Sequence, residues 1–150
     1  MTYRTILVGT DGSETAERAV GEAARIAAHM DGRLVIVTAY RPMSPEERAR
    51  LLAELPDEMA WRVTGTAQAE EIVERGRIVA AQRGVEAAGR VVEGEHPSEA
   101  ILDVAEEESA DLIVVGNKGM TGARRFLLGS VPNNVSHHAR CDVAIVRTHV

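Results

Sequence analysis

Short apolar segments alternate with helical patterns along this chain, and the alternation restricts its fold more than any other feature. The expected strands are Thr5 to Val8, Leu34 to Val37, Val85 to Val92, Leu112 to Val115 and Asp142 to Arg147. A helix between two such strands is the βαβ signature of a parallel sheet with right-handed crossovers. The order βαβαβαβαβ predicts an α/β fold, with a single open, twisted, five-stranded parallel sheet that has helices on both faces.

Four helices are expected between these strands. The first follows Ser13 and repeats small apolar residues, mostly three or four apart, from Ala16 to Met30. A second is predicted from about Thr66 to Gln82. A third opens at Pro97, which suits a first helical position, and a fourth begins near Val131.

Several segments depart from the regular pattern. Residues Arg41 to Asp57 are charged and interrupted by prolines, which predicts a mobile excursion with one or two helical turns around Glu46 to Leu55. Trp61 is interpreted as an anchor that ties this excursion to the body. The run Glu106 to Glu108 is interpreted as the solvated end of a helix. The strand Val85 to Val92 is less apolar than the others, which indicates a sheet edge.

Composition limits the possible classes of function. At 150 residues and 45% hydrophobic content, the chain suits one domain spanning residues 1–150. A formal charge of −6 and an aromatic content of 3% argue against a nucleic-acid partner, because the net charge repels phosphates and few rings are available for bases. No apolar run approaches the ~20 residues of a membrane span, so no membrane partner and a cytoplasmic location are expected. The lone Cys141 excludes an intrachain disulfide and is interpreted as a packing residue.

Glycines gather after the expected strand Leu112 to Val115. Gly116 and Gly119 are three apart, and nine residues separate Gly119 from Gly129, which Ser130 follows. Glycine allows a backbone with positive φ and a close approach to a ligand, and Ser130 precedes a helix that offers N–H groups to an anion. A phosphate is therefore the first ligand to consider.

In open parallel sheets, ligands bind beyond the carboxyl ends of the strands, where the strand order reverses. The residues at this place are Thr10, Asp11 and Gly12 after the first strand, Gly116 to Gly119 after the fourth, and then Gly129, Ser130 and Val131. Asp11 is placed to accept hydrogen bonds from a ribose or a base, or to shape its own loop as an Asx-turn. Both roles can hold at once.

Neither G-x-x-x-x-G-K-[ST] nor G-x-G-x-x-G occurs in the chain, so a P-loop and a classical dinucleotide fold are not indicated. The spacing Gly116-x2-Gly119-x9-Gly129-Ser130 instead resembles the nucleotide motif of the universal stress protein family. The opening ILVGTDGSE, the segment Val37 to Pro42 and the closing CDVAIVR also resemble that family, over essentially the whole chain. The resemblance implies a Rossmann-like fold of the adenine nucleotide alpha hydrolase-like type.

The family resemblance also implies a set of site residues and a homodimer. Residues matching Asp11 and Ala39 approach the adenine, and those matching the three glycines and Ser130 surround the ribose and phosphates, with Val115 and Lys118 beside them. Such proteins are mostly homodimers, often paired through the strand matching Val143 to Val146. That pairing would also cover the exposed edge of an open sheet.

The resemblance further implies an adenine nucleotide as the ligand: cyclic AMP, AMP or ATP, with Mg²⁺ only if ATP binds. Pro132 stands where ATP-binding members often carry Ser or Thr, and it removes a backbone N–H near the outer phosphates. The segment VGN…GSVPNNVS resembles the actinobacterial branch that binds cyclic AMP. The leading hypothesis is a binding module in stress or signalling.

The alternative hypothesis is a slow ATPase or phosphotransferase that uses the same pocket. No general base is evident beside the glycine loop and no second acidic loop resembles a metal ligand, so no catalytic residue is assigned. The adjacent His137 and His138 point to different faces of a helix, so no metal site is expected either.

Overall fold

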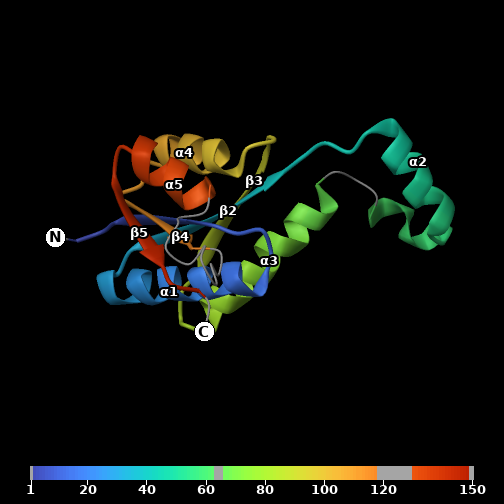
Figure 1. Cartoon of the computed structure of the whole chain (residues 1–150). Helices are drawn as coiled ribbons and strands as arrows, with labels where there is room; N and C mark the ends of the chain where they lie inside the picture. Colours follow the sequence, from blue (N-terminus) through green and yellow to red (C-terminus); the bar gives the residue numbers. More distant parts are fainter. Residues whose placement is uncertain (1, 63–65, 118–129, 149–150) are drawn as a thin grey trace.

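The computed structural model describes residues 2–62, 66–117 and 130–148 (Figure 1). Its centre is a five-stranded sheet in the order β3-β2-β1-β4-β5, and every neighbouring pair is parallel. The strands are β1 (Thr5–Gly9), β2 (Arg33–Tyr40), β3 (Ala87–Glu93), β4 (Leu112–Gly116) and β5 (Asp142–Val146). The predicted α/β fold is confirmed, and so is the edge position of the less apolar strand, which is β3.

Helices cover both faces of the sheet (Figure 1). The helices α1 (Glu14–Met30) and α3 (Ala67–Ala81) pack on one face, against Ile6, Val8, Leu34 and Ile36. The helices α4 (Pro97–Glu107) and α5 (Ser130–His138) pack on the other, against Leu7, Val35, Ile113 and Val115. Successive strand residues point to opposite faces, so a continuous apolar run is what a strand covered on both sides requires.

The predicted excursion contains more helix than expected. The helix α2 (Pro45–Glu54) is ten residues long, Ser44 caps it, and a 3-10 helix η1 (Asp57–Arg62) follows. Both stand away from the sheet in Figure 1, and none of the α2 side chains is buried. The side chain of Trp61 lies outside the described part of the structure, so its anchoring role stays a prediction.

The acidic run at the end of α4 is not simply solvated. The Glu108 carboxylate accepts hydrogen bonds from Arg33 at 2.8 Å and from Arg90 at 2.9 Å, and Arg90 also pairs with Glu107 at 2.6 Å. The bonds from Arg33 and then Arg90 hold the pKa of Glu108 below its ordinary value. The run therefore ties α4 to β2 and β3, through partners that lie far from it in the sequence.

The starts of β1 and β4 are joined by a carboxylate. Asp111 Oδ2 accepts hydrogen bonds from the backbone N–H groups of Arg4 at 2.9 Å and Thr5 at 2.8 Å. The Asp111 N–H in turn donates to the Thr5 carbonyl at 2.8 Å. The N–H groups of Thr5 and then Arg4 hold the pKa of Asp111 below its ordinary value, because they favour the charged form. This contact sets the register of the two central strands at their amino ends.

Replacing Asp111 is expected to destabilise the fold in a pH-dependent way. Because its folded-state pKa is lowered, the carboxylate stabilises the fold above its unfolded pKa of about 4, and this contribution is lost as the pH falls through the folded value. Asp111→Ala should therefore lower the urea midpoint at neutral pH, with a difference from wild type that shrinks in acid. Asp111→Asn keeps one acceptor oxygen, so its urea midpoint should lie between those of wild type and Asp111→Ala. A difference that is constant from neutral pH into acid would refute this account.

Candidate functional site

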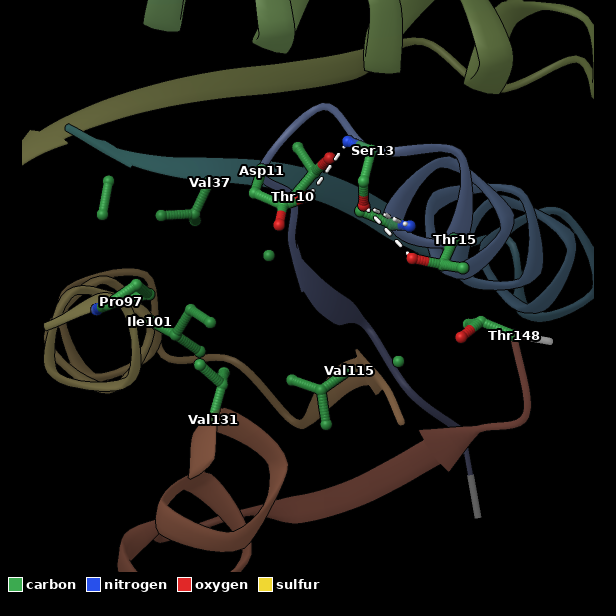
Figure 2. A pocket seen from close by; sticks show the side chains of 14 residues that line it. Thr10, Asp11, Ser13, Thr15, Val37, Pro97, Ile101, Val115, Val131 and Thr148 are labelled. Carbon is green, nitrogen blue, oxygen red and sulfur yellow. Dashed lines mark hydrogen bonds between the residues drawn. The ribbon is translucent and has the colours of Figure 1, made fainter. Parts of the chain in front are cut away.

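A cavity opens at the carboxyl ends of the central strands, where β1 and β4 part (Figure 2). Six of the residues singled out from the sequence line it: Thr10, Asp11, Ala39, Val115, Gly116 and Val131. They come from four separate parts of the chain, the loop after β1, the end of β2, the end of β4 and the first turn of α5. The structure therefore brings these six residues together at the carboxyl end of the sheet.

Backbone and hydroxyl contacts fix the loop that leaves β1. The Thr10 N–H donates to the Val37 carbonyl at 2.9 Å, and the buried Thr38 hydroxyl donates to the Thr10 carbonyl at 2.8 Å. The Gly12 N–H donates to the Thr10 hydroxyl at 3.1 Å. Gly12 has φ of 82° and a Cβ there would meet Ile72 of α3, so this position needs glycine. The loop is thus fixed by hydrogen bonds to β2 and by close packing against α3.

Asp11 shapes the same loop. Its Oδ1 accepts a hydrogen bond from the Ser13 N–H at 2.9 Å, which makes the Asx-turn that the sequence predicted. The Ser13 hydroxyl then accepts from the Ala16 N–H at 3.2 Å and caps α1. In Figure 2 the side chains of Asp11, Ser13 and Thr15 lie together on the polar side of the cavity.

The opposite side of the cavity is apolar. Pro97 and Ile101 of α4, Val115 of β4 and Val131 of α5 form it (Figure 2). Gly9 allows the close approach of α4, because an added Cβ would come within 2.5 Å of the Ile101 Cδ1. A flat heteroaromatic ring fits a cavity with one apolar wall and one wall of hydroxyl and carboxylate oxygens.

Not every predicted site residue can be placed in this cavity. Gly12 supports the loop but does not line the cavity, and Lys118, Gly119 and Gly129 lie outside the described residues. Ser130 begins α5, but its side chain also lies outside the described part.

The lining residues that the sequence did not assign to the site are Gly9, Ser13, Thr15, Ala16, Val37, Pro97, Ile101 and Thr148. Ile101 and Pro97 carry an ordinary core or helix-start pattern, and Thr148 lies in no motif. Only its position in the fold brings it to the cavity.

The histidine pair and Cys141 are the other groups that the sequence raised as candidates. Within residues 2–62, 66–117 and 130–148, no three His, Cys, Asp or Glu side chains gather as metal ligands would. Burial, followed by the negative charges of Asp142 and Asp111, raises the pKa of the half-buried Cys141 thiol. A raised pKa disfavours the nucleophilic thiolate, which agrees with a packing role.

In the described part of the chain, no helix has the length and apolar character needed to cross a membrane.

Comparisons with known proteins identify the family to which the chain belongs. The model of the universal stress protein family matches residues 2–147. A universal stress protein of Mycobacterium tuberculosis strain H37Rv is 43% identical over 147 residues, which cover 97% of this chain and 97% of that protein. The chain belongs to the universal stress protein family.

Solved structures show the same fold with nucleotides bound. A universal stress protein crystallised in complex with cAMP is 36% identical, with a TM-score of 0.75 and coverage of 99% of both chains. The universal stress protein from Archaeoglobus fulgidus in complex with dAMP is 25% identical, with a TM-score of 0.70 and coverage of 98% of this chain and 100% of that one. This chain is therefore similar to proteins that bind adenine nucleotides.

The Thr38 hydroxyl should be important for the stability of the loop that leaves β1. Thr38→Val keeps the shape of the side chain but leaves the Thr10 carbonyl without this donor, so the free energy of unfolding should fall by about 1–3 kcal/mol. Thr66→Val is a suitable control, because the Thr66 side chain makes no capping hydrogen bond at the start of α3. Urea denaturation would measure both variants. A Thr38→Val protein within about 0.5 kcal/mol of wild type would disprove the importance of this bond.

Proposed function

We propose that the cavity between β1 and β4 binds an adenine nucleotide and that the protein is a binding module in stress or signalling. The observation that carries this proposal is the convergence of Thr10, Asp11, Ala39, Val115, Gly116 and Val131 on one cavity at the switch point of the sheet. The cAMP and dAMP complexes of similar proteins support it. Nucleotide binding at this place is also what the geometry of open α/β sheets favours.

The arrangement of the walls suggests how the nucleotide lies. The base would contact the apolar side formed by Ile101, Val115 and Val131, with its polar edge near Asp11 and the backbone of Ala39. The ribose and phosphates would lie towards Gly116 and the start of α5, where helix N–H groups favour negative charge. Lys118, Gly119, Gly129 and Ser130 complete this part of the proposed site, as the family motif implies.

Pro132 favours a ligand with one phosphate. It is buried in the first turn of α5 and has no backbone N–H, so this helix start offers one donor fewer to an anion. ATP carries the most phosphate charge of the three candidates and loses most from a missing donor. We therefore rank cyclic AMP and AMP above ATP, and Mg²⁺ belongs to the proposal only if ATP binds.

The charge of Asp11 distinguishes a role in binding from a role in loop shape. Asp11→Asn keeps an oxygen for the Ser13 N–H but removes the charge, whereas Asp11→Ala removes both. If the carboxylate accepts hydrogen bonds from the ligand, Asp11→Asn should weaken cyclic AMP and AMP binding about ten- to a hundredfold in calorimetry. Asp57→Asn, on the excursion, should bind like wild type. Unchanged affinity in Asp11→Asn would mean that the charge of Asp11 has no part in binding, and that Asp11 acts through the Asx-turn.

The same titrations test the choice of ligand and the enzymatic alternative. Calorimetry with ATP, AMP and cyclic AMP contradicts our ranking if ATP binds much the tightest. Single-turnover hydrolysis of labelled ATP, with Gly119→Val as the control, tests a slow ATPase or phosphotransferase. Rapid hydrolysis that this substitution abolishes would replace the binding module with an enzyme.

We further propose that two copies pair through β5. This strand is an edge of the sheet, and an unpaired edge is a template for another strand. Ile145 on β5 is 38% exposed, which is unusual for a large apolar residue in this chain and suits an interface. In the proposed dimer, Val143 to Val146 of one copy would lie beside the same segment of the other copy.

Substitution of Ile145 should break the proposed dimer. Ile145→Lys places a charge on the proposed interface and should convert a dimer to a monomer in sedimentation or light scattering. Ile78→Lys is a matched control, because Ile78 is 52% exposed but lies on α3, away from β5. Monomeric wild-type protein, or a dimer that survives Ile145→Lys, would rule out this interface.

A further inference from the structure

The chain folds back to the cavity after it leaves β5. Thr148 follows the exposed Arg147, yet only 1% of its surface is exposed, and it lines the cavity together with Thr15 (Figure 2). We call the two residues Arg147 and Thr148 the strap. Thr148 lies outside the strands and helices, so its burial calls for specific contacts.

Four hydrogen bonds involve the strap and its neighbours. The Thr148 N–H and hydroxyl both donate to Asn117 Oδ1, at 3.2 and 3.0 Å. The Arg18 guanidinium of α1 donates to the Thr148 carbonyl at 2.8 Å, and the Asn117 N–H donates to the Val146 carbonyl at 3.0 Å. Both backbone polar groups of Thr148 are therefore bonded to residues far away in the sequence.

The strap also packs closely on the end of β4. A Cβ added to Gly116 would come within 2.8 Å of the Thr148 Cγ2, so the threonine methyl group occupies the space that glycine leaves. Gly116 and Asn117 are the residues by which the chain leaves β4 at the cavity. The Thr148 methyl group thus packs against Gly116, while its hydroxyl and N–H bind the Asn117 side chain. Both contacts hold the end of β4 in place.

We propose that Thr148 is a positioning residue of the nucleotide site, which acts through Gly116 and Asn117 to hold the exit of β4 in the shape that binds the ligand. This inference rests on the proposed function. Opening of the strap breaks the bonds of Thr148 to Asn117 and removes Thr148 from the lining of the cavity, so the open form binds the nucleotide poorly. By linkage, a bound nucleotide then favours the closed strap.

Two substitutions separate the hydroxyl from the methyl group. Thr148→Val keeps the packing on Gly116 and the backbone N–H bond to Asn117 but removes the hydroxyl bond to Asn117, whereas Thr148→Ser keeps the hydroxyl. Loss of one hydrogen bond should speed amide exchange at Asn117 and at position 148 about three- to tenfold in Thr148→Val, and weaken AMP and cyclic AMP binding by a similar factor. Thr148→Ser should weaken binding less than Thr148→Val does, because the hydroxyl that contacts Asn117 remains and only the methyl contact with Gly116 is lost.

Exchange measured by NMR with and without AMP or cyclic AMP gives the decisive comparison. In wild-type protein, saturating nucleotide should slow exchange at both positions, although neither amide needs to touch the ligand. A purely structural threonine predicts a lower urea midpoint for Thr148→Val with unchanged nucleotide affinity, and that result overturns the proposal. Exchange at Asn117 that nucleotide does not slow in wild-type protein also overturns it.

Failure of the proposed function gives a different result. If wild-type protein binds none of the nucleotides in calorimetry, the nucleotide site is wrong, and Thr148 has no site to position. If wild-type protein binds and Asp11→Asn weakens binding while Thr148→Val does not, the site stands and only the role of Thr148 is refuted.

Discussion

The central position of β1 is the constraint on which the site depends. β1 is hydrogen-bonded to β2 on one side and to β4 on the other, and its residues Ile6, Leu7 and Val8 have no exposed surface. The helix α1, which follows β1, packs on one face of the sheet, and α5, which follows β4 in the sequence, packs on the opposite face. The two exits must separate, so a cavity forms between them without any special sequence. The residues around it then decide what the cavity binds.

The polar groups of the loop after β1 are largely satisfied within the protein. Thr10 is bonded through its N–H and its carbonyl to β2, and Asp11 holds the Ser13 N–H. A loop fixed in this way needs little reordering when a ligand arrives, so less binding energy is lost to conformational entropy. The loop consists of short side chains, so each of its side-chain hydrogen bonds depends on a single hydroxyl or carboxylate group.

The sequence predicts those parts of the structure that depend on local patterns. Strand order at the edges, helices on both faces and the meeting of Asp11 with Gly116 all follow from short apolar runs and from the rule that parallel strands end together. It does not predict the ion pairs of Glu108, because Arg33 is 75 residues away and nothing local marks the pair. Thr148 was missed for the same reason, since its partner Asn117 lies 31 residues before it.

The strand β5 connects the proposed dimer interface with the strap. Its outer edge is the proposed dimer interface, and its carboxyl end continues directly into the strap at Arg147 and Thr148. The Val146 carbonyl accepts a hydrogen bond from the Asn117 N–H, so the end of β5 is bonded directly to the residue that follows β4. A partner that orders this edge and a nucleotide that needs the closed strap favour the same arrangement of β5. Pairing and ligand binding should therefore strengthen each other, because both stabilise a single conformation of one short strand.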